Sequence, residues 1–441
     1  MDTQAANTRP RRRWYTVFAL SSAAFADSME QFGLQILWPY IYRSLDLAVA
    51  QLAPLLSIPR ALGVVFGPLW GYLGDRISRK WLIVIMTGFW GLWTAAVGFA
   101  DNYFQLLAFR IIATLGLGVL GPASMSLMAD FFNRKERGRA AGFMSAAGYL
   151  GNLLSLVVLG ALAASSPEAW RFGFIIVGSL SLLTGLLALG IPEPPRGAVE
   201  PELAGVVTGE NAARIQLKLL PQLVRIATWE LLLVVEVMDF IGFTIISAWI
   251  ITWMDQLGMG MGAQLVMALM AVAMILGHLG FGWLSDAVEK RNPRYGRVLL
   301  GQIGYIIYAV SIIGFLLLGP QNIVYLLVFG ALVGFSFSLK STGARTPILQ
   351  SVLPPELRAT GRALIDWIST LCTSAGIAFS GWLLTRLGDD MQTMLLIMVP
   401  FPILLAALTW PFLFRTYPMD MEHLKLRLGE QREQILNKEI I

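Results

Sequence analysis

The stretch GYLGDRISRK, residues 71–80, follows a long apolar run and sets one aspartate among glycines and basic residues. A related stretch, GWLSDAVEKR, occupies residues 282–291 after another apolar run, and its Asp286 stands 211 positions after Asp75. Glycines at such a position allow close helix packing, and the basic residues suit a short cytoplasmic loop between two membrane spans. The recurrence of this stretch predicts that the chain contains a duplicated unit.

Two further pairs of features recur at nearly the same offset. KERGR and PELRA, residues 135–139 and 355–359, carry glutamates 220 positions apart. An acidic pair in the first apolar run, Asp27 and Glu30, recurs as a second acidic pair 209 positions later. Three features within about ten residues of one offset make chance a poor explanation. In a duplicated membrane protein, the solute site is expected near mid-membrane between the two halves.

Apolar runs long enough to cross a bilayer, about 20 residues each, recur along the whole chain. A backbone in hydrocarbon must satisfy its hydrogen bonds internally, so each run is predicted to be a helix. We therefore expect an all-α membrane protein with twelve transmembrane helices in two pseudo-symmetric six-helix bundles. The expected spans are 14–42, 51–74, 81–100, 103–129, 139–164, 171–191, 229–254, 263–286, 297–319, 322–346, 359–386 and 391–415.

One long break separates the two halves. It opens with PEPPRG, residues 192–197, and prolines at this density cannot continue a membrane helix. The expected organisation is a cytoplasmic N-tail, an N-terminal bundle, a cytoplasmic linker, a C-terminal bundle and a cytoplasmic C-tail, at 1–13, 14–191, 192–228, 229–415 and 416–441.

Composition excludes several function classes. Hydrophobic residues make up 56% of the chain and charged residues only 14%, against about 25% charged residues in soluble proteins. The net charge of +5 therefore indicates basic membrane loops rather than nucleic-acid binding. One cysteine and two histidines leave no intrachain disulfide and no Cys- or His-rich metal site. Because no P-loop and no hydrolase motif occurs, we expect neither ATP-driven transport, nor an enzyme, nor a bound cofactor.

The distribution of lysine and arginine predicts the orientation. With both termini in the cytoplasm, the opposite face holds only Arg43, Arg171 and Arg386, and the other loop cations, Arg358 and Arg362 among them, are cytoplasmic. This asymmetry follows the positive-inside rule. We expect a multi-pass protein of the bacterial inner membrane, with its N- and C-termini inside.

On these residues the chain resembles the major facilitator superfamily. Residues 71–80 match the loop motif G-x-x-x-D-R-x-x-R-K of that family, between the second and third spans. Arg110, with Gly116 and Gly118, resembles the family's R-x-x-x-x-x-G-x-G pattern in the fourth span. The resemblance implies a secondary transporter in which two six-helix bundles rock around a bound solute.

Within that superfamily, the nearest likeness is to the spinster group of lysolipid and sphingolipid transporters. It rests on residues 71–76, on residues 193–197 after the sixth span, and on the spacing that follows Arg110. The likeness implies that Glu30 is the carboxylate of helix one and Arg110 the arginine of helix four. The sequence departs from the group at Leu117, where the group has a glutamate.

Ionisable residues inside the spans are the candidate solute and proton sites. At a helix centre such a residue costs about 2.5–3.5 kcal/mol on insertion scales, so it normally faces a cavity or a partner. Glu30 is the first choice for proton coupling, since a carboxylate in a low-dielectric environment is more easily protonated. Protonating Glu30 would free Arg110 for an anionic group. The alternative is that these charges are buried pairs that fix helix packing, and both interpretations apply to Asp27, Arg60, Glu236, Asp239, Lys340 and Asp366.

For two other polar residues within the spans, a structural interpretation stands beside a functional one, in which Arg345 is a cation of the solute cavity and His278 is a group that titrates near neutrality. Arg345 lies near the cytoplasmic end of the tenth span, where its long side chain can extend to the interface. His278, in a glycine-rich part of the eighth span, is interpreted as a packed histidine.

The loop after the second span is a candidate conformational latch. Asp75 at a helix end can meet the positive N-terminus of a neighbouring helix, which the family resemblance implies is helix eleven. Arg79 would pair with Asp130, and the alternative is that the basic residues are only topology anchors. The latch residues are Gly71, Gly74, Asp75, Arg76, Arg79, Asp130 and Asp286.

Together these features predict a monomeric, proton-coupled transporter. The expected solute is a small amphipathic organic anion or zwitterion, with a lysolipid among the candidates, and membrane lipid is the other expected partner. A drug/proton efflux antiporter, an organic-acid/proton symporter and a transport-incompetent membrane sensor remain as alternatives.

Overall fold

The computed structural model describes residues 12–117, 120–132, 134–192, 220–354 and 357–439, and these residues form helices and short connections without a strand. Contacts within the chain divide it into two compact units, Met1–Ala213 and Arg214–Ile441. The all-α architecture expected from the sequence is therefore confirmed.

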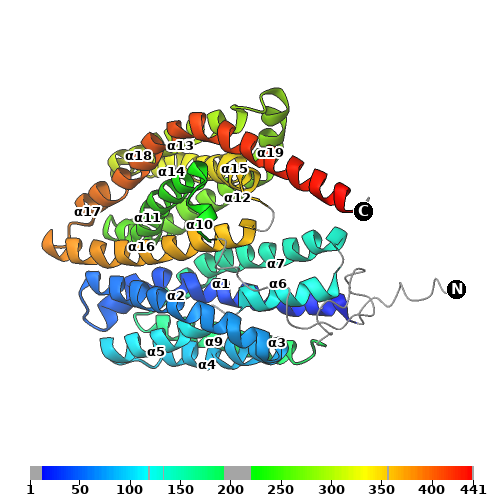
Figure 1. Ribbon diagram of the computed structural model, residues 1–441. Coiled ribbons are helices and arrows are strands. Elements are labelled where there is room, and N and C mark those ends of the chain that lie inside the picture. Colours follow the sequence, from blue (N-terminus) through cyan, green and yellow to red (C-terminus); the bar gives the residue numbers. More distant parts are fainter. Residues whose placement is uncertain (1–11, 118–119, 133, 193–219, 355–356, 440–441) are drawn as a thin grey trace. The chain divides into compact units, whose positions relative to one another are not determined.

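The first unit is built from long helices, some of them broken into consecutive segments (Figure 1). Two of these segments, η2 and η3, are π-helical. The elements are α1 (Arg13–Ser44), η1 (Val49–Gln51), α2 (Leu52–Arg76), α3 (Arg79–Ile83), η2 (Val84–Phe89), α4 (Gly91–Val97), α5 (Tyr103–Leu117), α6 (Leu120–Phe131), α7 (Arg134–Leu154), η3 (Ser155–Leu159), α8 (Gly160–Ala163) and α9 (Ala169–Ala188).

The second unit has the same character and contains one π-helical turn, η7. Its helices α11 and α16 pack against each other, as do α12 and α14. The elements are α10 (Leu220–Leu223), α11 (Ala227–Gln256), α12 (Met261–Arg291), α13 (Gly296–Leu318), η6 (Gly319–Gln321), α14 (Ile323–Lys340), η7 (Ser341–Arg345), α15 (Thr346–Val352), α16 (Arg358–Arg386), α17 (Met391–Met398), α18 (Pro400–Thr409), η9 (Trp410–Phe412) and α19 (Leu413–Glu439).

Ten helical stretches of the described residues are long and apolar enough to cross a membrane. Each overlaps one of the spans expected from the sequence. The other two expected spans, 14–42 and 103–129, coincide with α1 and with α5 followed by α6. The helices therefore agree with a twelve-span membrane fold.

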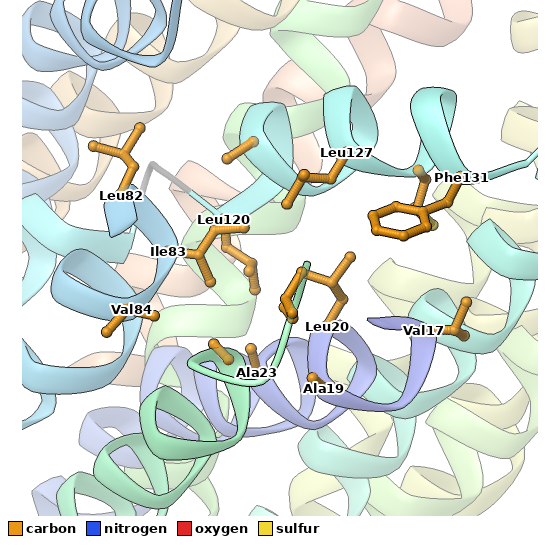
Figure 2. Close-up of a cluster of buried hydrophobic side chains, with 14 of the residues drawn as sticks. Val17, Ala19, Leu20, Ala23, Leu82, Ile83, Val84, Leu120, Leu127 and Phe131 are labelled. Atoms are coloured by element: carbon orange, nitrogen blue, oxygen red, sulfur yellow. The ribbon is translucent and has the colours of Figure 1, made fainter. Parts of the chain in front are cut away.

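One hydrophobic core of the first unit joins α1, α3 and α6. Val17 and Leu20 of α1 pack there with Ile83 of α3 and with Leu127 and Phe131 of α6, all buried (Figure 2). These side chains recur every three or four residues along α1 and α6, the period of one helix face. This packing fixes the helix that carries Asp27 and Glu30.

Glycines allow η2 and α4 to approach α9 closely. A Cβ atom added to Gly88 would lie 2.3 Å from the Cα atom of Gly185, and one added to Gly91 would lie 2.5 Å from the Cβ atom of Ser181. Small residues at such contacts bring helix backbones together where no hydrophobic effect drives association. The position of Thr94, one turn after Gly91, depends on this contact.

In the second unit, the end of the chain secures the start of α11. The carboxylate of Asp420 in α19 accepts a 2.7 Å hydrogen bond from the backbone N–H of Thr228, in the first turn of α11. A carboxylate at a helix N-terminus satisfies a free N–H group and complements the helix dipole. Trp410, ten residues before Asp420, is fully buried. Its indole N–H donates a 2.8 Å hydrogen bond to the carbonyl of Val298.

A polar cluster joins three loops at the predicted outer end of the first unit. Glu168 accepts hydrogen bonds from the Ser44 hydroxyl and from Arg171 Nε, both at 2.6 Å. Arg171 also donates to the carbonyls of Gly98 and Ala100, at 3.2 and 2.6 Å. The hydrogen bond from Ser44, and then that from Arg171, lowers the pKa of Glu168.

Candidate functional site

The first unit contains a buried ion pair between its first and fourth predicted spans. Glu30 of α1 and Arg110 of α5 are 4% and 5% exposed, and Arg110 Nη1 lies 3.7 Å from Glu30 Oε1. Glu30 is also hydrogen-bonded to the side chain of Thr94 in α4. Three helices therefore converge on one carboxylate.

This ion pair leaves several polar groups unused. The Nε and Nη1 groups of Arg110 and the Oε1 atom of Glu30 are buried without a hydrogen-bond partner. The 3.7 Å separation is too long for a hydrogen bond. A buried polar group without a partner costs about 1–3 kcal/mol, and more when it is charged. The site therefore favours a further ligand that accepts hydrogen bonds from the guanidinium.

Asp27 and Arg60 extend the same cluster. Asp27 is 6% exposed and lies one turn before Glu30, within electrostatic range of its carboxylate. Arg60 of α2 is half-buried and within electrostatic range of Arg110. Within the described part of the chain, neither Asp27 nor Arg60 forms a hydrogen bond or an ion pair. The described part of the first unit thus gathers two carboxylates and two guanidinium groups, and Glu30 and Arg110 among them form an ion pair.

The second unit holds a larger set of charges, which we call the ionic network: Glu236, Asp239, Lys340, Arg345, Arg362 and Asp366. At its centre Asp239 of α11 is fully buried and contacts the ammonium group of Lys340, also fully buried. Arg345 Nη1 donates to the same carboxylate at 2.7 Å. Two cations therefore share one buried carboxylate.

Glu236, one turn before Asp239, continues the network toward solvent. Arg345 Nε lies 3.5 Å from Glu236 Oε2, and Arg362 Nη2 lies 2.7 Å from Glu236 Oε1. Arg362 of α16 also contacts Asp366, one turn later on the same helix. The side chains of Glu236, Arg362 and Asp366 are 1%, 38% and 54% exposed. The network thus extends from the fully buried pair of Asp239 and Lys340 to the partly exposed pair of Arg362 and Asp366.

The π-helical turn η7 explains why Lys340 and Arg345 converge. Residues five apart lie about 140° apart around an ideal α-helix. A π-helix closes its hydrogen bonds between residues five apart and so brings them to nearly the same face. Lys340 ends α14 and Arg345 ends η7. The widened turn directs both side chains to Asp239.

Aromatic rings surround the ammonium group of Lys340. Its Nζ atom lies 4.1 Å from the ring centroid of Tyr308, 4.5 Å from that of Phe337 and 5.1 Å from that of Tyr305. Such contacts favour a cation through the negative face of each ring. Arg345 Nη1 additionally donates to the Tyr305 hydroxyl at 3.4 Å.

The latch expected after the second span lies partly outside the described residues. The side chains of Asp75 and Asp130, and the surroundings of Gly71 and Gly74, are not described. Arg76 is exposed and Arg79 is buried. Asp286 is the counterpart of Asp75 in the second unit. Its carboxylate lies 3.3 Å from Arg297 Nη2, which also contacts Glu289 at 2.6 Å.

Some members of the ionic network were not predicted from the sequence as site residues. Arg345 was expected at the interface but is 3% exposed, and Arg362 was expected only as a topology anchor. Tyr305 and Tyr308 carried no signal, because tyrosines are common in membrane spans. Within the described residues, no three His, Cys, Asp or Glu side chains gather in a way that could hold a metal ion.

Two helical units with buried charges in their membrane-spanning helices define a multi-pass membrane transporter. The family model of the Major Facilitator Superfamily matches residues 20–372, so the chain belongs to that superfamily. It is a transporter and not an enzyme.

Individual relatives are distant but extend over much of the chain. The probable 4-methylmuconolactone transporter of Cupriavidus pinatubonensis is 25% identical, with 88% of each chain covered. The cis,cis-muconate transport protein of Acinetobacter baylyi is 28% identical over 64% of this chain and 66% of its own length. Among solved structures, a bacterial homologue of the human lysosomal transporter Spinster, inward-facing and unoccupied, matches with a TM-score of 0.77 at 19% identity, covering 93% of this chain and 97% of that one. The structural likeness confirms the fold. Protein spinster of Drosophila melanogaster is also similar in sequence, 25% identical over 43% of this chain and 31% of its own length.

Proposed function

We propose that this protein moves a small organic anion across the bacterial inner membrane by alternating access, as a monomer coupled to protons. In this proposal, Arg110 binds the anionic group of the solute and Glu30 carries the coupled proton. Asp27 and Arg60 adjust the charge around them.

The unused donors of Arg110 are the observation that carries the proposal. A buried cation without full compensation is strongly unfavourable, and Glu30 meets Arg110 only at 3.7 Å. A carboxylate can accept two parallel hydrogen bonds from one guanidinium. A solute carboxylate would therefore satisfy the Nε group that no side chain satisfies, with Nη2 as the second donor, while Nη1 stays on the side of Glu30.

Charge balance supports a coupled proton. With Glu30 ionised, the Glu30–Arg110 pair is neutral, and an added anion would leave a net negative charge in a low-dielectric environment. If Glu30 is protonated, Arg110 and the solute form the neutral pair instead. Solute and proton would then be favoured together, which is the thermodynamic requirement for coupling.

The relatives support a carboxylate over a lipid. One similar protein is named for cis,cis-muconate, a six-carbon dicarboxylate, and another for a methylmuconolactone. The spinster likeness keeps lysolipids as the competing solute class, and the two classes are separated by direct transport measurements.

The test is flux into proteoliposomes with cis,cis-muconate, a lysolipid and a cationic drug, each with and without a pH gradient. The wild type should exchange muconate and accumulate it when the gradient is imposed. Glu30→Gln, which mimics the protonated side chain, should keep exchange but lose gradient-driven accumulation. Arg110→Ala should lose muconate binding, and Arg110→Lys should keep only part of it, because lysine lacks the two-pronged geometry.

Glu230→Gln is the matched control, since Glu230 is an exposed glutamate in the first turn of α11. It should behave as the wild type does. If Glu30→Gln still accumulates muconate with unchanged pH dependence, the proton site lies elsewhere, and Asp27 and Asp239 become the next candidates. Flux of the lysolipid alone would contradict the organic-acid assignment.

A further inference from the structure

The outer end of the ionic network differs from its centre in exposure and in charge balance. Asp239 and Glu236 carry two negative charges, and Lys340 and Arg345 carry two positive charges, so these four buried residues are neutral by themselves. Arg362 and Asp366 form an additional neutral pair at the edge, with side chains 38% and 54% exposed. The buried centre therefore does not require Asp366.

The contact between Arg362 and Asp366 has the geometry of a guanidinium that binds a carboxylate ligand. Arg362 Nη2 donates to Asp366 Oδ1 at 2.6 Å, and Nε donates to Oδ2 at 3.1 Å. This is the two-pronged arrangement in which arginine recognises carboxylates. Here the carboxylate comes from the same helix, four residues away, so it can turn away without any movement of the backbone.

Arg362, by contrast, is held in place. Its Nη1 and Nη2 groups also contact Glu236, at 3.2 and 2.7 Å, and Glu236 is fixed by burial and by Arg345. If the Asp366 side chain rotated away, contacts with Glu236 would still hold the guanidinium in place. The Nε–H group and one N–H of Nη2 would then be free to donate to another carboxylate. Any incoming carboxylate would restore the neutrality of the cluster.

We propose that Arg362 is a carboxylate-binding residue of the second unit, and that Asp366 occupies its site as a replaceable internal ligand. The choice of an organic carboxylate as the external ligand rests on the proposed function. Because α16 begins at Arg358, the site lies in its first three turns, at the end of the helix that we predict to be cytoplasmic. Exposed pairs within one helix are weak, so an external carboxylate competes with Asp366 on nearly equal terms.

The test reads Arg362 directly rather than through transport. Phenylglyoxal modifies accessible arginines, and mass spectrometry of the purified full chain gives the modification rate at Arg362. The probes are cis,cis-muconate and sorbate, which share a six-carbon diene chain and differ by one carboxylate. Both should slow modification of Arg362. Asp366→Asn should shift the protecting concentration down by roughly two- to fivefold, as expected from removing a weak surface pair.

Glu168→Gln is the matched control. Glu168 is likewise an exposed carboxylate that pairs with an arginine close by in sequence, Arg171, at 2.6 Å. This variant should leave protection of Arg362 unchanged. Absence of protection in both the wild type and Asp366→Asn, or an equal shift in Glu168→Gln, would overturn the proposal.

The outcome is separable from that of the proposed function. Muconate flux without protection of Arg362 would leave the transport proposal intact and refute the site. Protection of Arg362 without muconate flux would support the binding site and refute the proposal that muconate is a transported solute.

Discussion

Lys340 and Arg345 stand five residues apart along one continuous helical segment, and both side chains contact the same carboxylate, that of Asp239. In a regular α-helix these two side chains would diverge. The π-helical turn between them is therefore what concentrates two cations on one buried anion. This relationship determines how the second unit should respond to loss of any one charge.

Asp239→Asn should be strongly destabilising. It removes the anion while Lys340 and Arg345 stay buried, and breaking a buried pair in this way typically costs about 3–5 kcal/mol. The double variant Asp239→Asn with Lys340→Gln should recover part of that loss, because one uncompensated cation is gone. Thermal unfolding in detergent measures both. A double variant less stable than Asp239→Asn alone would contradict this account.

Gly88→Ala should weaken the packing of η2 against α9. The added methyl group would lie 2.3 Å from the Cα atom of Gly185, a backbone atom that cannot rotate away. Overpacking of this kind typically costs about 1–3 kcal/mol. Gly63→Ala is the control, since nothing beyond its own helix turn lies within 4 Å of an added Cβ there. Equal melting temperatures for the two variants would show that the close contact is not needed.

Single cysteines test the predicted orientation. In a Cys372→Ser background, cysteines introduced at Asn102 and Asn292 both occupy exposed positions between helices. With the termini inside, only the cysteine at 102 should react when an impermeant thiol reagent is added outside intact cells. Reaction of the cysteine at position 292 under the same conditions would contradict the predicted orientation.

The polar cluster around Glu168 should make the free energy of unfolding depend on pH in the acidic range. Hydrogen bonds from Ser44 and Arg171 lower the pKa of Glu168, so the folded state binds the proton less well than the unfolded state does. Its stabilising contribution is present above the ordinary pKa of a glutamate and is lost as the pH falls through the lowered value. The difference in the free energy of unfolding between the wild type and Glu168→Gln should be small, at most about 1 kcal/mol for so exposed a group, and should vanish in acid. A difference that grows in acid would contradict this sign.

The sequence was most informative where a physical requirement acts on composition. Bilayer thickness sets the length of apolar runs, so the positions of α9, α11 and α13 followed from hydropathy alone. The internal repeat placed Glu236 and Asp239 as counterparts of Asp27 and Glu30, and all four are buried. An acidic residue in an apolar run signals a special environment whatever its partner is.

The partners themselves could not be predicted, because they depend on local departures from regular helix. Nothing in the residues from Ser341 to Arg345 marks a π-turn, yet that turn decides whether Arg345 reaches the interface or Asp239. Arg362 carries the same positive-inside signal as Arg358, and only the packing of α16 against α11 distinguishes them. Loop cations and site cations are equivalent in sequence when a helix begins at the membrane surface.

The contact between Asp420 and Thr228 has a consequence for biogenesis. The two residues are 192 positions apart, and translation adds about 5–20 residues per second. Thr228, in the first turn of the helix that carries Glu236 and Asp239, is therefore synthesised roughly 10–40 s before the carboxylate that caps it. During that interval the N–H group of Thr228 must find another hydrogen-bond acceptor, such as water.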